Sequence, residues 1–250
     1  MTQVVISPEW FASKDMIILG FSVITLLLIA AFSLRFYFFK KKEHKSYLYF
    51  AASFLLLAIS FLWKIATDIT VYYNLVKTKQ AGLLTITYQS MYAEKVLFVV
   101  GHFAHYLLML LGLYILYVVL NRKSTMNHLL ILYFIVMTTI FSNFSYFIFH
   151  LTAFVLLSGI SYRYYLTCKK NKRNLTKLIF ISFSIITASQ ILYMFVKLWG
   201  NIYAAAQIIQ LVGFVLLLVA FIWVLKNGKK KSNRHNKRHA WFYSSKGWEN

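Results

Sequence analysis

The chain has 250 residues, of which 60% are hydrophobic, 19% aromatic and only 13% charged. A mean hydropathy of +0.64 is too apolar for a water-soluble domain of this length and predicts an integral membrane protein. A single proline and scattered glycines exclude collagen-like, linker-rich and disordered classes, and the lone Cys168 excludes an intramolecular disulfide and a cysteine-based metal cage.

Hydrophobic runs divide the chain into seven predicted membrane-spanning helices. A helix needs about 20 residues to cross the hydrocarbon core of a bilayer, and most of the runs reach that length. Residues 127 to 162 contain no charged side chain, and the polar Ser142-Asn143 pair divides this stretch into two helices. The predicted spans are about 16–40, 47–73, 92–120, 127–142, 144–168, 177–199 and 203–225. Residues 1–226 should therefore form an all-α transmembrane bundle, followed by a tail at 227–250.

The distribution of basic residues predicts the orientation of this bundle, because short cytoplasmic loops carry an excess of Lys and Arg. When the ends of spans one, three, five and seven lie on one side, that side and the tail together carry 21 of the 27 basic residues. Lys64 lies within a span, and the opposite side carries only Lys14, Lys77, Lys79, Lys95 and Lys197. We expect a multi-pass protein of the cell membrane with its N-terminus outside and its C-terminus in the cytoplasm.

A sequence pattern near the N-terminus recurs in the second half of the chain. Both copies read Ser-x-Arg-aromatic-Tyr, then Lys-Lys, then Ser-Phe, over residues 33–54 and 161–183. The displacement is 128 residues between Ser33 and Ser161 and 129 residues between Ser53 and Ser182. Residues 112–123 also resemble 213–226. Spans one to three should thus match spans five to seven in a 3+1+3 parallel repeat, with the short fourth span returning the chain to its starting side.

Polar side chains within the spans gather toward the predicted outer end. Because such groups cost free energy in lipid, they should face the bundle interior or water, and we expect them to line a polar cavity that opens outward. The candidate residues for binding a ligand or an ion are Lys64, Asp68, Glu94, His102, His105, His150, Gln190, Lys197 and Gln207.

Two sets of these candidates allow more than one interpretation. Lys64 and Asp68 are four residues apart, so they share a helix face and form either a neutralising pair or a titratable or ligand-binding pair. His102, His105 and His150 could make interhelical hydrogen bonds, sense pH or hold a metal. Interhelical hydrogen bonding is the simplest interpretation, and we predict neither a metal nor a cofactor.

The tail is strongly basic and close to the membrane. Binding to anionic lipid headgroups is the simplest explanation, at about 1 kcal/mol for each basic residue near the surface. A nucleic-acid contact is disfavoured because no recognisable fold accompanies the charge. The predicted lipid-binding residues are Lys229, Lys230, Lys231, Arg234, Lys237 and Arg238.

Motifs of known enzymes are absent from the sequence. It contains no His-Glu-x-x-His, no phosphate-binding glycine loop and no Ser/His/Asp arrangement in a soluble region. We therefore predict a protein that is not an enzyme.

The predicted plan of seven helices in a 3+1+3 repeat resembles that of several membrane families. Microbial rhodopsins carry a retinal-linked lysine in the seventh helix, but residues 208–224 contain none. The Pro-Gln motifs of the PQ-loop sugar transporters are missing, as are the Asp-Arg-Tyr and Asn-Pro-x-x-Tyr motifs of G-protein-coupled receptors. What is left is a generic resemblance to prokaryotic seven-helix sensor modules, such as the membrane region of some histidine kinases, without a kinase domain.

This resemblance implies a receptor-like or sensory protein. A small ligand, ion or proton would bind in the outward cavity, and the signal would pass to a cytoplasmic or membrane protein partner. One alternative is a small-solute or proton-coupled transporter that uses the same residues. Another is a structural subunit of a membrane complex.

Overall fold

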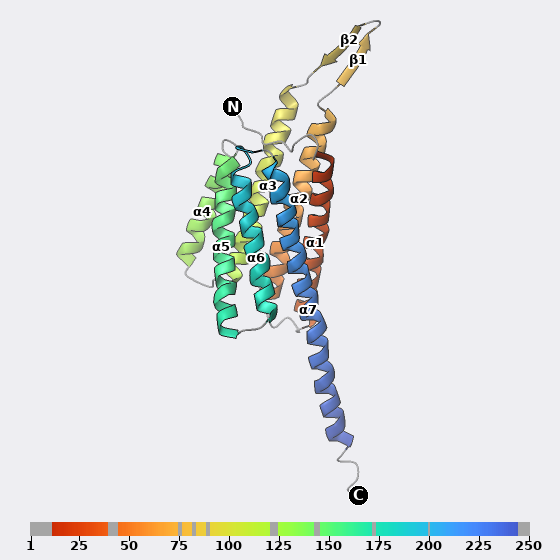
Figure 1. The fold of residues 1–250 in the computed structure, drawn as a ribbon, viewed down its shortest axis with the longest axis vertical. Helices are drawn as coiled ribbons and strands as arrows, with labels where there is room; N and C mark the ends of the chain where they lie inside the picture. The colour runs from red at the N-terminus through yellow and green to blue at the C-terminus, as the bar shows by residue number, and fades with distance from the viewer. Residues whose placement is uncertain are drawn as a thin grey trace.

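The computed structural model describes residues 12–39, 45–74, 77–81, 84–88, 91–120, 125–142, 146–171, 174–199 and 201–244. These residues form seven helices and one two-stranded hairpin (Figure 1). The helices are α1 (Ala12–Phe39), α2 (Ser46–Asn74), α3 (Met91–Leu120), α4 (Thr125–Ser142), α5 (Tyr146–Asn171), α6 (Asn174–Met194) and α7 (Ile202–Ser244), and the strands are β1 (Lys77–Ala81) and β2 (Leu84–Tyr88).

Six of these helices are long and apolar enough to cross a membrane. Their outward surfaces are rich in large apolar side chains, such as Phe21, Leu62 and Val155, which are 57%, 47% and 60% exposed. A surface of this kind suits contact with lipid tails. The prediction of a helical multi-pass membrane protein is therefore confirmed. The apolar part of α4 is shorter, Leu129–Ser142.

The helix boundaries mostly agree with the hydrophobic runs, but two ends differ. The hydrophobic pattern predicts a sixth span that reaches residue 199, whereas α6 ends at Met194 and a turn follows. In this turn the main-chain hydrogen bonds join residues three apart, as in a 3₁₀-helix; one example runs from Leu198 N to Phe195 O at 2.9 Å. At the other end, α7 does not stop near residue 225 but continues through the basic segment to Ser244, and it projects beyond the bundle (Figure 1).

The hairpin between α2 and α3 is not anticipated by the sequence analysis. Its strands pair antiparallel, with Lys77 opposite Tyr88 and Ala81 opposite Leu84. The run Leu-Thr-Ile-Thr-Tyr in β2 has the β-branched and aromatic composition typical of strands. The hairpin projects beyond the bundle, at the end where α1 begins (Figure 1).

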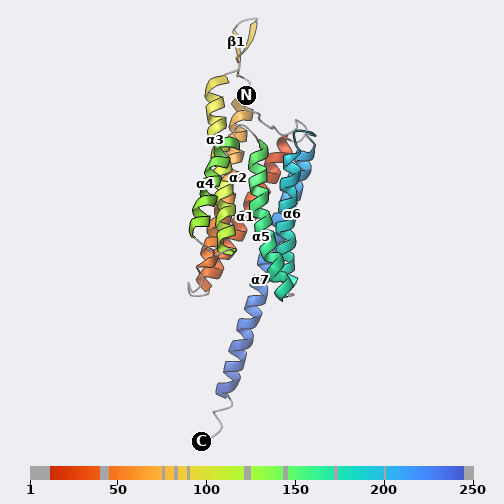
Figure 2. The same ribbon diagram turned by 90° about the vertical axis from the view of Figure 1, so that its left-hand side faces the viewer.

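Two sets of three helices make up most of the bundle. In the first three-helix unit, α2 packs against α1 and α3; in the second, α6 packs against α5 and α7. The two units meet where α1 contacts α7 and where α3 contacts α5. Helix α4 packs against the edges of α3 and α5, on one side of the bundle (Figure 2). The shared core is built from fully buried apolar side chains, including Leu26, Phe54, Leu110, Phe149, Leu157 and Leu217.

A glycine brings the helices close together in each unit. A Cβ atom at Gly112 of α3 would lie 3.0 Å from the main-chain oxygen of Ser53 in α2. At Gly213 of α7 it would lie 3.2 Å from the main-chain oxygen of Ser182 and 2.5 Å from Cγ1 of Ile186, both in α6. Only glycine permits this approach, as is common where membrane helices pack.

Candidate functional site

The candidate site is a buried group of polar side chains at one end of the bundle. Because neighbouring helices in the sequence run antiparallel, the start of α1, the end of α2 and the start of α7 lie at the same end. Asp15 comes from the first of these segments, Lys64 from the second, and Tyr203 and Gln207 from the third. We call these four residues the polar network.

Hydrogen bonds connect all four members of the polar network. The Lys64 ammonium donates to the Tyr203 hydroxyl at 2.9 Å, and that hydroxyl donates to Asp15 Oδ2 at 2.9 Å. Gln207 donates from Nε2 to Asp15 Oδ1. The ammonium also lies 5.4 Å from the centroid of the Tyr203 ring. The carboxylate thus has a donor for each oxygen, and the hydroxyl relays between two opposite charges.

Burial makes these bonds energetically important. The side chains of Asp15 and Gln207 are 5% and 2% exposed, Tyr203 is also buried, and Lys64 is half-buried. A buried charge is tolerated when it is paired and hydrogen-bonded, whereas removing one partner exposes the full desolvation cost of the other. Lys64 also lies within electrostatic range of Asp68, one helical turn further along α2. The network therefore holds opposite charges that depend on one another.

A second polar chain leads from α5 into α6. Ser189 Oγ donates to the main-chain oxygen of Ile186 at 2.7 Å, so it accepts the Nε2 hydrogen of Gln190 at 3.4 Å. That contact turns Gln190 Oε1 toward His150 Nδ1, at 2.8 Å. Since Oε1 can only accept, Nδ1 must carry the hydrogen. In the neutral imidazole, Nε2 of His150 is then a bare acceptor.

Tyrosine rings connect the two polar groups. The His150 ring stacks on Tyr193, with centroids 4.7 Å apart, and packs against Tyr146 at 4.3 Å. Tyr193 in turn meets the Tyr203 ring edge to face at 5.8 Å, and its hydroxyl donates to Gln210 at 3.1 Å. His150 and the polar network thus lie on either side of one cluster of aromatic rings.

Two polar atoms in this region are buried without a hydrogen-bond partner among the described residues: His150 Nε2 and Gln207 Oε1. Their side chains are 5% and 2% exposed. A buried polar group without a partner costs about 1–3 kcal/mol, and such groups in native proteins usually indicate a bound water, an ion or a functional role. The site therefore can accept two further hydrogen bonds from a ligand, one at each of these atoms.

His105 has a separate role. Its Nδ1 donates to the main-chain oxygen of Ser60 at 2.9 Å, and Ser60 Oγ donates back to the main-chain oxygen of His105 at 3.0 Å. These bonds tie α3 to α2 within the first unit. The simplest sequence interpretation, an interhelical hydrogen bond, applies to His105.

The structure distributes the remaining candidate residues unevenly. His102 is half-buried with its ring edge against Tyr106, and Asp68 is half-buried. Lys197 is exposed in the turn after α6, so it is not part of the buried group. Glu94 lies on α3, but its side chain is outside the described part of the structure, as are those of Lys229, Lys230, Lys231, Arg234, Lys237 and Arg238 on α7. Among the described side chains, Lys64 and Gln207 meet in the polar network, and His150 meets Gln190.

Sequence reasoning missed Asp15, Tyr203 and Tyr193. Asp15 is one of only six acidic residues and stands at the start of an apolar run. This position could have identified it as a candidate site residue. The two tyrosines gave no such signal, because tyrosine near a helix end is typical of the membrane interface. Within the described residues, no group of three His, Cys, Asp or Glu side chains could hold a metal ion.

The polar network also joins the two three-helix units. Between residues described on both sides, the side-chain hydrogen bonds from one unit to the other include Lys64 to Tyr203, Tyr203 to Asp15 and Gln207 to Asp15. Further along the interface the units meet through apolar contacts, such as Phe61 against Phe214. The polar network is therefore one polar attachment between the two units.

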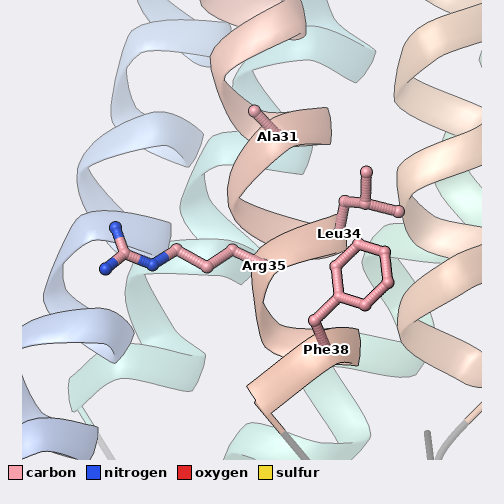
Figure 3. Close-up of a pocket in the computed structure, with 4 residues that line it drawn as sticks. All are labelled: Ala31, Leu34, Arg35 and Phe38. Atoms are coloured by element: carbon pink, nitrogen blue, oxygen red, sulfur yellow. The ribbon is translucent and has the colours of Figure 1, made fainter.

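An interior cavity of about 10 Å³, at the lower limit for one water molecule, lies between the units and is lined by apolar residues such as Leu57 and Ile186 and by Gln210. An open groove of about 460 Å³ lies on the opposite half of α1, lined by Ala31, Leu34, Arg35 and Phe38 (Figure 3). Arg35 extends away from Leu34 and Phe38 there (Figure 3).

Comparison of the chain with protein-family models, with curated proteins and with solved structures found no match.

Proposed function

We propose that this is a receptor-like, non-enzymatic protein of the cell membrane that binds a small ligand, ion or proton at the polar network and signals to a cytoplasmic partner. The observation that carries the proposal is the pair of unsatisfied acceptors, Gln207 Oε1 and His150 Nε2, in a buried site that also holds opposite charges. A merely structural network would gain stability by satisfying these atoms internally. A binding site keeps them available.

The proposal places the polar network at the outer face. In the proposed topology α4 is the fourth of seven membrane spans. The two termini then lie on opposite sides of the membrane, in accord with the distribution of basic residues. The proposal also includes the 3+1+3 parallel repeat. In support, Ser53 and Ser182, matched by the sequence repeat, each face a glycine, Gly112 and Gly213, that the sequence also matches.

Helix α7 offers a direct route for the signal. Tyr203 and Gln207 of the polar network lie in the first two turns of α7, and the same helix continues to Ser244. Its 43 residues correspond to about 65 Å at 1.5 Å per residue. A shift of α7 caused by binding would thus displace the basic segment, where anionic lipid headgroups or a partner protein would respond.

The proposal is tested by ligand-dependent stability. Purified protein in nanodiscs would be melted at pH 5 to 8 and with a panel of ions and small solutes, alongside Asp15→Asn and the control Thr25→Ala. Thr25 lies on the same helix, and its hydroxyl bonds to its own helix at Phe21. A ligand of the native state raises the melting temperature by mass action. Stabilisation in wild type and Thr25→Ala that is lost in Asp15→Asn supports the proposal, and flat responses in all three contradict it.

One observation favours a transporter as the second candidate. Hydrogen bonds of the polar network join the two units at one end, so exchange of these bonds for bonds to a solute would allow the units to rock against each other. Uptake of labelled solutes into liposomes that contain the protein separates the two functions. Asp15-dependent flux would favour the transporter, and binding without flux the receptor.

A further inference from the structure

We infer that the polar network recognises a small protonated primary amine. The inference rests on the proposed function and names its ligand class. Three independent features of the site lead to this chemistry: its charge, the kind of hydrogen bond it lacks and its aromatic walls.

The charge of the site requires a cation. Among the described side chains that are buried or half-buried at this end, Asp15 and Asp68 are acidic and Lys64 is the one base, when His is neutral. Lys14 and Lys197, at the same end, are exposed. The described side chains that are buried or half-buried there therefore carry one excess negative charge, and an anionic ligand would add to it.

The missing hydrogen bonds require a donor. Gln207 directs its amide nitrogen to Asp15, which leaves Oε1 as an acceptor. The chain through Ser189 and Gln190 leaves His150 Nε2 as an acceptor as well. An ammonium group donates three hydrogen bonds and accepts none. Hard metal cations such as Ca²⁺ and Mg²⁺ would take the amide oxygen but prefer oxygen ligands throughout, so imidazole fits them poorly.

The walls of the site already hold an ammonium group. Lys64 Nζ lies over the Tyr203 ring and bonds to its hydroxyl, and Tyr193 and Tyr146 continue the aromatic surface toward His150. Aromatic faces attract cations by about 0.5–2 kcal/mol, more when water is excluded. Lys64 thus shows how a ligand amine would be bound.

The burial of the network limits the size of the ligand and indicates its path. Because Asp15 and Gln207 are almost fully covered, a ligand larger than a small amine would have to separate the two units. Asp68 is half-buried and lies one turn nearer the end of α2 than Lys64. An incoming cation would therefore meet Asp68 first and Asp15 afterwards.

Methylammonium is the probe for the test, with sodium chloride at equal ionic strength and tetramethylammonium as controls. In nanodiscs, methylammonium should raise the melting temperature of wild type above the sodium chloride value. Tetramethylammonium, which has no N–H group, should not. Asp15→Asn should weaken the apparent affinity for methylammonium by about tenfold or more, because the negative charge that attracts the ammonium group is lost.

A second variant keeps the test decisive if Asp15→Asn fails to fold. Lys64→Ala removes the resident ammonium, and methylammonium should restore more of its lost stability than it adds to Lys177→Ala. Lys177 is an exposed lysine on α6 outside the network. Equal effects of methylammonium and sodium chloride on wild type and Lys64→Ala would overturn the inference.

The outcomes also separate this inference from the proposed function. If another solute, or a change of pH, stabilises the protein through Asp15 while methylammonium does not, the receptor remains and the amine class is wrong. If tetramethylammonium acts as well as methylammonium, the hydrogen-bond argument is wrong. If nothing binds, both proposals fail.

Discussion

The Tyr203 hydroxyl donates a hydrogen bond to Asp15 across 188 residues of chain, and it accepts one from Lys64 at the same time. One oxygen atom thus joins the start of α1, the end of α2 and the start of α7. Because it lies between a buried carboxylate and an ammonium, its removal affects both charges and the attachment of the two units.

Tyr203→Phe should destabilise the protein by about 1–3 kcal/mol. The substitution keeps the ring but deprives Asp15 Oδ2 and the Lys64 ammonium of this partner, and an unsatisfied buried group costs this much. Thermal melting in nanodiscs measures the change. The matched control is Tyr133→Phe, at a tyrosine of α4 that is 57% exposed. Equal melting temperatures for the two variants would show that the hydroxyl contributes nothing.

Asp15 and Lys64 should be coupled through the hydroxyl that bonds to both. Either single substitution, Asp15→Ala or Lys64→Ala, leaves the opposite charge uncompensated in the interior, whereas the double variant leaves neither. The loss of stability in the double variant should therefore be smaller than the sum of the single losses, by about 0.5–3 kcal/mol. A double-mutant cycle on melting in nanodiscs gives this value. Strict additivity would mean that the hydroxyl relay carries no coupling.

Alanine should have different effects on stability at two glycines. At Gly213 the added Cβ would lie 2.5 Å from Ile186 Cγ1, so α7 and α6 must separate, and we expect a loss of about 1–3 kcal/mol. At Gly20 of α1 nothing lies within 4 Å of the added atom. Gly20→Ala should therefore be neutral or stabilise the helix by up to about 1 kcal/mol.

The Gly213 effect has its own internal check. Ile186→Ala removes the atom that a Cβ at position 213 would meet, so the double variant should lose less stability than the two single losses combined. If Gly213→Ala is as well tolerated as Gly20→Ala, the close approach of α6 and α7 is not present in the membrane.

Much of the fold could be predicted from the sequence because a bilayer imposes a strong signal, a long apolar run. The run from 92 to 120 gave α3 within a residue, and α5 and α7 begin within two residues of the expected positions. Hydropathy does not determine where a helix stops once it has left the bilayer. The end of α6 at Met194 and the extension of α7 to Ser244 therefore differed. The polar composition of β1, Lys-Thr-Lys-Gln-Ala, concealed the hairpin.

The site was harder to predict because it depends on contacts between distant helices. Lys64, Gln207, His150 and Gln190 were identified since polar side chains within apolar runs are rare. Their partners were not, because the sequence cannot show that Asp15 faces α7 rather than the solvent beside Lys14. The position of Lys197 falls within a predicted span, whereas in the structure it is exposed in the turn after α6.

The tautomer of His150 is a further prediction that NMR can measure. The chain from Ile186 through Ser189 and Gln190 places the hydrogen on Nδ1 and leaves Nε2 bare. Protein labelled with ¹⁵N-histidine should therefore show a protonated Nδ1 and an unprotonated Nε2 for this residue. The variant His150→Gln identifies the signals by their loss.

Gln190→Leu removes the acceptor that fixes this tautomer, so the His150 signals should move toward those of an unconstrained imidazole. The His105 signals should stay unchanged, because its Nδ1 is held by the main-chain oxygen of Ser60. A His150 that carries its hydrogen on Nε2 in the wild type would contradict the assignment of Nε2 as a bare acceptor. It would also remove one of the two acceptors on which the amine site depends, and the ligand would then have to satisfy a donor and an acceptor together.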